Sequence, residues 1–298
     1  MKNSCPSRRT LTRPLIGILY MLGMAFLSAA MNSAARHITD TIHPFEIVFF
    51  RNLFGSLFVL PIIIRYGFSI LKTQRFSTHL GRAGLNVINH LFFFTALSLT
   101  TLSELVALGF TAPIFTTMLA VILFGEIVGW RRWGAIIFAF FGTLIILKPG
   151  IDNITLGHGI TLMAALTWAG VLLFIKSLSD TERSITIVAY ATFLMTPLSL
   201  IPALFVWQWP TYNELMWLAF IGLTAGCAQF FIAQALHETD LNVVMPFDFT
   251  KLIWVSVIAF LFFGEIPELT TWIGGAFIFS AGIYVAHREA AKNPKTGS

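Results

Sequence analysis

Long apolar stretches, separated by short polar segments, fill most of the chain. A helix needs about 20 mostly apolar residues to cross the hydrocarbon core of a bilayer. Ten stretches approach that length, at residues 15–34, 44–64, 82–99, 102–123, 130–148, 157–177, 185–206, 213–235, 241–262 and 269–287. Only 11% of the residues are charged, far below the roughly 25% of soluble domains. The pattern therefore predicts an all-α integral membrane protein with ten transmembrane helices and the lipid bilayer as its surroundings.

The second half of the chain repeats the first. The letters FGEI stand at residues 124–127 and again at 263–266, and Trp133 and Trp272 have the same separation. Five helices in each copy would place the second copy upside down in the membrane, and such inverted repeats are typical of secondary transporters. We therefore expect a cytoplasmic tail, two inverted five-helix repeats and a second cytoplasmic tail, at residues 1–14, 15–149, 157–287 and 288–298.

The basic residues indicate how the helices are oriented, because Lys and Arg collect on the cytoplasmic side. With the N-terminus in the cytoplasm, 15 of the 19 basic residues fall on that side, and two, Arg36 and Lys148, fall on the other. The remaining two, Arg51 and Lys251, lie inside predicted helices. We expect both tails in the cytoplasm. The net charge of +5 then reflects topology, and we expect no nucleic-acid partner.

Sequence motifs of other function classes are missing. The chain contains no GxxxxGK[ST] phosphate loop, no HExxH zinc motif, and no GxGD, paired-aspartate or GxSxG pattern of an intramembrane enzyme. We therefore expect neither an enzyme nor a nucleotide-driven pump, with no catalytic residues, metal or cofactor. The open alternatives are a secondary transporter for a small-molecule substrate, which works by alternating access, and a channel or passive facilitator.

A charged pair interrupts the ninth predicted helix. Lys251 lies about ten residues into it, near the bilayer midplane, and Asp248 lies one turn earlier on the same face. A charge at that depth costs about 2.5 to 3.5 kcal/mol on insertion scales and usually marks a transport pathway. The repeat offset places Gly109 and Ala112 at the matching positions, so the scaffold itself does not require these charges. We predict a substrate-binding pair, the alternative being an ion pair that only neutralises itself.

Arg51 lies about seven residues into the second predicted helix. It is a candidate for binding an anionic substrate group or a carboxylate such as Glu104, or for stabilising the fold through helix ends or Glu46. Both glutamates are expected near the outer rim of the bundle.

Polar and aromatic side chains in other helices complete the candidate site. The third predicted helix carries Asn86, Asn89 and His90, the first carries Asn32, and the sixth carries Trp168. These amides either bind substrate or only form hydrogen bonds between helices. If transport is coupled to protons rather than to a counter-substrate, His90 is the candidate for the titrating group. Trp168 is a candidate for stacking on a planar ligand.

Two prolines are expected to break helices beside these residues. Pro113 lacks a backbone donor and should kink the fourth predicted helix, leaving a carbonyl free near the cavity. Pro246 should act in the same way just before Asp248. A kinked helix beside a charged pair is a plausible binding site.

Three segments resemble a known family. FEIVFFRNLFG in the second helix, TAPIFTTMLAVILFGE in the fourth, and MPFDFTKLIWVSVIAFLFFGEIPE near the end are similar to the EamA branch of the drug/metabolite transporter superfamily. The resemblance covers nearly the whole chain. It implies a ten-helix, multi-pass transporter of the bacterial inner membrane.

Members of this branch export amino acids or drugs, or import vitamins or nucleoside-like metabolites, so the resemblance leaves the direction open. FFRN together with PFDFTKLIW is most similar to members assigned to uptake of riboflavin or S-adenosylmethionine. In relatives, the first, third, fourth, sixth, eighth and ninth helices line the cavity. By position this implies Asn32, Asn89, His90, Trp168, Gln229, Asp248 and Lys251. Arg36 stands where many members have lysine, which puts its role in doubt.

Overall fold

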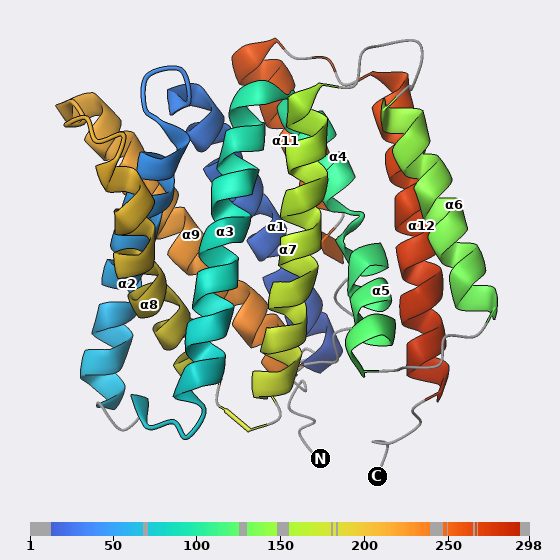
Figure 1. Ribbon diagram of the computed structural model, residues 1–298, viewed down its shortest axis with the longest axis horizontal. Coiled ribbons are helices and arrows are strands. Elements are labelled where there is room, and N and C mark those ends of the chain that lie inside the picture. The colour runs from blue at the N-terminus through green and yellow to red at the C-terminus, as the bar shows by residue number, and fades with distance from the viewer. Residues whose placement is uncertain are drawn as a thin grey trace, which may run out of the picture.

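The computed structural model describes residues 13–67, 71–124, 130–147, 155–179, 181–182, 184–238, 247–248, 250–264, 266 and 268–292, which form helices joined by short connections (Figure 1). The helices are α1 (Arg13–Ile38), α2 (Pro44–Tyr66), α3 (Phe76–Leu99), α4 (Leu102–Gly109), α5 (Ala112–Phe124), α6 (Trp130–Leu147), α7 (Leu156–Ser179), α8 (Ser184–Leu204), α9 (Tyr212–Glu238), α11 (Thr250–Phe263) and α12 (Leu269–Lys292). No strand occurs among the described residues, which confirms the predicted all-α class.

Five of the helices are long and apolar enough to cross a membrane, at Leu15–Ile38, Pro44–Arg65, Leu156–Ile175, Ile185–Leu204 and Tyr212–Ile232. Shorter apolar helices accompany them, among them Thr250–Phe263. Large apolar side chains face outward around the bundle; Ile64, Ile122 and Phe262 are each more than 70% exposed. Such a surface suits lipid better than water.

The fourth predicted helix is broken in the structure. Helix α4 ends at Gly109 and α5 begins at Ala112. At the break, the amide of Phe110 donates to the carbonyl of Ala107 at 3.2 Å, and that of Thr111 donates to Leu108 at 3.0 Å, so the last turn is tightened to three-residue spacing. Pro113 has no N–H to continue the ladder. The interruption therefore falls where this proline predicts it.

The structure describes the ninth predicted helix only in part. Helix α11 begins at Thr250, and residues 247–248 are also helical. Lys251 lies in the first turn of α11. Pro246 lies outside the described residues. Thr250 corresponds to Thr111 in the sequence repeat, so α5 and α11 begin at nearly the same point of each copy.

Several helices pack as antiparallel pairs, among them α1 with α9 and α3 with α7 (Figure 1). Helix α1 runs along α9, and α3 runs along α7; α2 packs on α8 and α9, and α4 packs on α7 and α11. Helices α6 and α12 form a separate pair at the right-hand edge of Figure 1. The largest apolar core lies among α1, α2, α3, α4, α9 and α11, with Ile47, Phe94 and Leu218 fully buried in it.

Glycines allow the closest of these approaches. A Cβ built on Gly222 in α9 would overlap the Cβ of Phe54 and would lie 3.1 Å from the carbonyl oxygen of Arg51, both in α2. A Cβ on Gly274 in α12 would lie 2.5 Å from the carbonyl oxygen of Gly142 in α6. Small residues at such positions let helices associate in a membrane through close van der Waals packing.

We expect Gly222→Ala to destabilise the protein by about 1 to 3 kcal/mol, because the added methyl group forces α9 away from the backbone of α2. The matched control is Gly159→Ala in α7, where an added Cβ meets nothing within 4 Å and alanine favours the helix. Thermal unfolding in detergent measures both. Equal melting temperatures for the two variants would contradict the close α2–α9 contact.

Candidate functional site

The charged pair lies near the start of α11, beside the break between α4 and α5. Lys251 Nζ is 3.4 Å from Asp248 Oδ1, and it stands 5.7 Å above the ring centre of Phe110. Phe110 occupies the break between α4 and α5, and α4 packs against α11. The side chains of Lys251 and Asp248 remain 22% and 19% exposed. The pair is therefore only partly buried, and a cation over an aromatic face is a recognised binding contact.

Arg51 lies in a different environment. It is 7% exposed, and its Nη1 donates to Asn52 Oδ1 at 3.0 Å. Asn52 in turn donates to the hydroxyl of Ser199 in α8 at 3.2 Å, and Ser199 donates to the carbonyl of Met195 at 2.7 Å. The Nε atom of Arg51 has no hydrogen-bond partner among the described residues. Arg51 is therefore the first residue in a buried series of hydrogen bonds that joins α2 to α8.

The polar residues of α3 point to different neighbours. Asn89 donates to the carbonyl of Ala164 at 2.7 Å and lies 3.4 Å from the hydroxyl of Thr167, both in α7. His90 is 8% exposed and lies within electrostatic range of Arg51. Its Nδ1 has no hydrogen-bond partner within the part of the chain that the structure describes. Asn89 thus links two helices, and His90 belongs to the surroundings of Arg51.

The other predicted residues lie on the helices that the sequence assigns to them. Asn32 is 3% exposed in α1, and its Oδ1 has no hydrogen-bond partner among the described residues. Trp168 is half-buried in α7, next to Thr167. Gln229 is half-buried in α9.

The structure does not gather all these residues into one cluster. Within the described residues, no hydrogen bond, ion pair or ring contact joins Lys251 and Asp248 to Arg51, Asn89 or His90. The helix packing explains this, because α11 lies against α1 and α4, whereas α2 lies against α8 and α9. The predicted constellation therefore divides into an accessible pair at the helix breaks and a buried group around Arg51.

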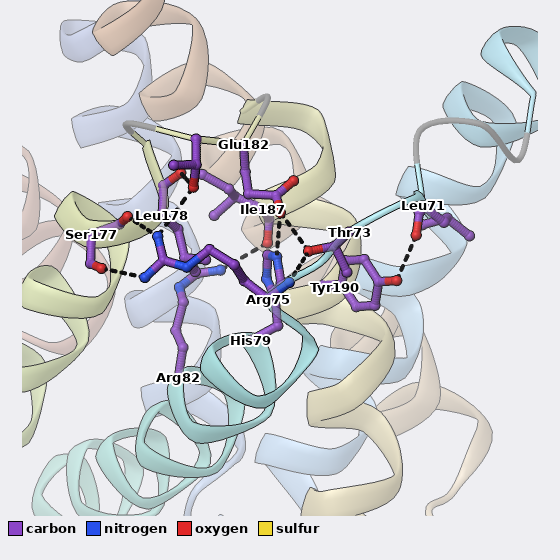
Figure 2. Close-up of polar contacts among 11 residues, drawn as sticks. Leu71, Thr73, Arg75, His79, Arg82, Ser177, Leu178, Glu182, Ile187 and Tyr190 are labelled. Atoms are coloured by element: carbon purple, nitrogen blue, oxygen red, sulfur yellow. Dashed lines mark hydrogen bonds and ion pairs between the residues drawn. The ribbon is translucent and has the colours of Figure 1, made fainter.

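Sequence reasoning missed a polar cluster at one end of the bundle (Figure 2). We call this the α2–α3 end, because the α2–α3 and α7–α8 connections meet there (Figure 1). Arg75 donates from Nη1 to the carbonyl of Ser177 at 2.5 Å and to the hydroxyl of Thr181 at 3.1 Å, and from Nη2 to the hydroxyl of Ser177 at 2.7 Å. From the sequence, Arg75 was only one of the basic residues that indicate the cytoplasmic side. Its hydrogen-bond partners lie far along the chain, so no local sequence pattern could have predicted them.

A glutamate and a histidine complete the cluster. The hydroxyl of Thr73 donates to Glu182 Oε1 at 2.5 Å, and His79 Nε2 is 4.0 Å from the same oxygen. His79 stacks on Tyr190 with 4.5 Å between ring centres, and the Tyr190 hydroxyl donates to the carbonyl of Leu71 at 2.6 Å. The cluster therefore fastens the α2–α3 connection to the ends of α7 and α8.

The opposite end, which we call the α8–α9 end, has a contact of its own. The amide of Gln208 donates to Glu46 Oε1 at 2.6 Å. Glu46 lies at the rim of the bundle, as expected, but it is only 1% exposed. Trp207 packs beside it, with its ring centre 5.6 Å from those of Phe49 and Phe50.

Comparisons with known proteins agree with this fold. The chain matches the EamA-like transporter family twice, over residues 15–148 and 155–286. It is 32% identical to a riboflavin transporter of Vibrio cholerae over 94% of this chain and 96% of that protein. It is 27% identical to an S-adenosylmethionine uptake transporter of Rickettsia bellii over 92% of this chain and 94% of that protein. A solved crystal structure with 18% identity superposes with a TM-score of 0.64 over 96% of this chain and 99% of that one, which supports the fold alone.

We expect acid to destabilise the cluster at the α2–α3 end. Burial lowers the pKa of His79 below its ordinary value; Glu182 opposes this shift, whereas Arg82 and Arg75 reinforce it. The unfolded chain then binds a proton at a higher pH than the folded chain does, so stability is lost as the pH falls below 6.5.

The variant His79→Phe keeps a ring for Tyr190 and removes the titrating group. Its melting temperature should fall less than that of the wild type between pH 8 and pH 5.5. Identical pH slopes for the two proteins would contradict a buried, neutral His79.

Proposed function

Because this chain belongs to the EamA-like transporter family, we propose that it is a secondary transporter that moves a small organic metabolite by alternating access. The family match covers both halves of the chain, and the names of the similar proteins describe transporters and not enzymes. In this proposal the protein lies in the bacterial inner membrane with both termini in the cytoplasm. Ten membrane segments are arranged as two inverted repeats.

The helix packing supports the inverted repeats. If α1, α2, α3, α4–α5 and α6 correspond in order to α7, α8, α9, α11 and α12, every major contact has a counterpart. The contact of α1 with α9 corresponds to that of α7 with α3, and the contact of α2 with α9 corresponds to that of α8 with α3. The pairs α2–α8, α4–α11 and α6–α12 each correspond to themselves. Such pairing is expected for two copies related by a two-fold axis.

The observation that carries the binding site is the position of Lys251. Its ammonium group pairs with Asp248 and faces the ring of Phe110 at the break between α4 and α5, and it is not fully buried. Interrupted helices at the centre of a bundle are where secondary transporters hold their substrates. We therefore place the charged part of the substrate at Asp248 and Lys251.

Other residues have different roles in this proposal. Asn32 on α1, which packs against α11, and Asn89, Trp168 and Gln229 on α3, α7 and α9 line the path of the substrate in this proposal. Arg51 holds α2 against α8 and stabilises the wall of the cavity, because its contacts are internal and buried. His90 lies beside Arg51, and it is the candidate proton site if the substrate is not exchanged for another solute.

The named relatives suggest the substrate class. Riboflavin and S-adenosylmethionine both contain a planar heteroaromatic ring system with polar substituents, which suits a site that combines aromatic rings with a charge pair. We propose import of a compound of this class. Export of amino acids or drugs is the competing function, and a passive facilitator is the competing mechanism.

Counterflow in proteoliposomes tests the proposal. Vesicles preloaded with unlabelled riboflavin, S-adenosylmethionine or amino acids should accumulate the corresponding labelled compound transiently, because a carrier exchanges substrate faster than it loses it. A compound that enters without saturation or overshoot would identify a passive facilitator.

We expect Lys251→Ala to reduce counterflow at least about tenfold, equivalent to about 1.4 kcal/mol of binding free energy. The double variant Lys251→Ala/Asp248→Asn separates a binding pair from a structural one. Lys251→Ala alone leaves the Asp248 carboxylate without its partner, and the added Asp248→Asn change removes that unpaired charge. If the pair is only structural, the double variant should therefore recover transport. A binding pair would not. Lys72→Ala, in the exposed α2–α3 connection, is the control and should transport normally.

A further inference from the structure

At each end of the bundle, a glutamate accepts a hydrogen bond from a connection in the other half. At the α2–α3 end, Glu182 accepts from the hydroxyl of Thr73 at 2.5 Å. At the α8–α9 end, Glu46 accepts from the amide of Gln208 at 2.6 Å. The ribbon places these two ends at opposite faces of the molecule (Figure 1).

The two contacts lie in similar regions of the two halves, although not at matched residues. Glu46 lies in the first turn of α2, and Glu182 lies just before the start of α8. The partner in each case lies in the connection between the second and third helices of the other half. Glu182 lies four residues before the position in α8 that matches Glu46 in α2, and the donor is a side-chain hydroxyl in one contact and a backbone amide in the other. A glutamate near the start of the second helix of one half therefore holds the connection between the second and third helices of the other half, and this arrangement occurs at both ends with the two halves exchanging roles.

We propose that these contacts are paired clasps of the transport cycle, each released to open its own end while the other stays closed. The inference rests on the proposed alternating-access function. A carboxylate that holds a loop donor suits this task, because water replaces either partner once the end opens and no buried polar group is left unsatisfied.

The clasp at the α2–α3 end is reinforced by further polar contacts. Arg75 donates three hydrogen bonds to Ser177 and Thr181 at the end of α7. Arg82, which is 3% exposed, donates to the carbonyl of Ile187 in α8 at 2.8 Å. Figure 2 shows these side chains converging from α3 and the α2–α3 connection onto the ends of α7 and α8. All of these bonds connect one half of the chain to the other.

The clasp at the α8–α9 end is reinforced by aromatic packing. Trp207, next to Gln208, lies against Phe49 and Phe50 of α2. His37 at the end of α1 lies 5.0 Å from the ring centre of Trp217 in α9. The contacts at the two ends are thus reinforced by different chemistry.

Reversible cross-linking tests whether the clasps must open. Cys5 and Cys227 are first replaced by serine. Thr73→Cys/Glu182→Cys and Glu46→Cys/Gln208→Cys are then each bridged with a short bis-methanethiosulfonate reagent in proteoliposomes. The control is Thr211→Cys/Glu214→Cys, which replaces a 2.7 Å hydroxyl–carboxylate bond within the first turn of one helix.

We expect either clasp cross-link to reduce counterflow of labelled riboflavin or S-adenosylmethionine at least about tenfold, with recovery after reduction, and the control cross-link to change nothing. Normal counterflow with both clasps bridged would show that they are static contacts, and would overturn the proposal.

A second measurement needs no substrate. Ser177→Cys, at a half-buried position under Arg75, reports opening of the α2–α3 end through its rate of alkylation in lipid nanodiscs. Releasing this clasp with Glu182→Ala should accelerate alkylation at least about tenfold, and releasing the opposite clasp with Glu46→Ala should slow it. An unchanged rate in Glu46→Ala would show that the ends are not coupled, and would overturn the proposal. If the uncross-linked protein carried none of the tested compounds, the proposed substrate class would fail, and the alkylation rates would still decide the role of the clasps.

Discussion

The interior of a bilayer offers no water to backbone N–H and C=O groups, so each must be paired within the protein. Long apolar helices meet this requirement directly. The break between α4 and α5 meets it locally, because Thr111 returns its amide and its hydroxyl to the carbonyl of Leu108. Phe110, Thr111 and Ala112 are at most 6% exposed. The irregular backbone is therefore surrounded by protein and not by lipid. The charged pair lies beside this buried break.

The same constraint separates two kinds of charge in the bundle. Arg51 satisfies part of its guanidinium through Asn52 and, through that amide, reaches α8. Lys251 has a carboxylate beside it and an aromatic face beneath it, and it retains exposed surface. A charge held in a buried hydrogen-bonded chain stabilises one arrangement of helices. The Asp248–Lys251 pair, in contrast, is incompletely buried and lies beside the break between α4 and α5.

The bundle combines a repeated scaffold with unlike details. Equivalent helix pairs reproduce the same packing in both halves, whereas the charged pair occurs in the second half alone, and the two ends differ in their reinforcing contacts. Symmetry in the scaffold allows the halves to exchange conformations at little cost. Departures from this symmetry are where the two halves differ in chemistry. Gly222 lets α9 approach the backbone of α2 closely.

The sequence by itself determined the helical membrane fold, the break near Pro113 and the pairing of Asp248 with Lys251. Each of these depends on local properties: apolar length, a missing backbone donor, and closeness along one helix face. Only the tertiary structure decided that Arg51 lies apart from Lys251, that Asn89 is bonded to α7, and which loop each of Glu46 and Glu182 holds. When a helix is apolar on nearly every side, its sequence does not indicate which face packs against which neighbouring helix. Contacts between residues far apart along the chain therefore depend on how the whole bundle packs.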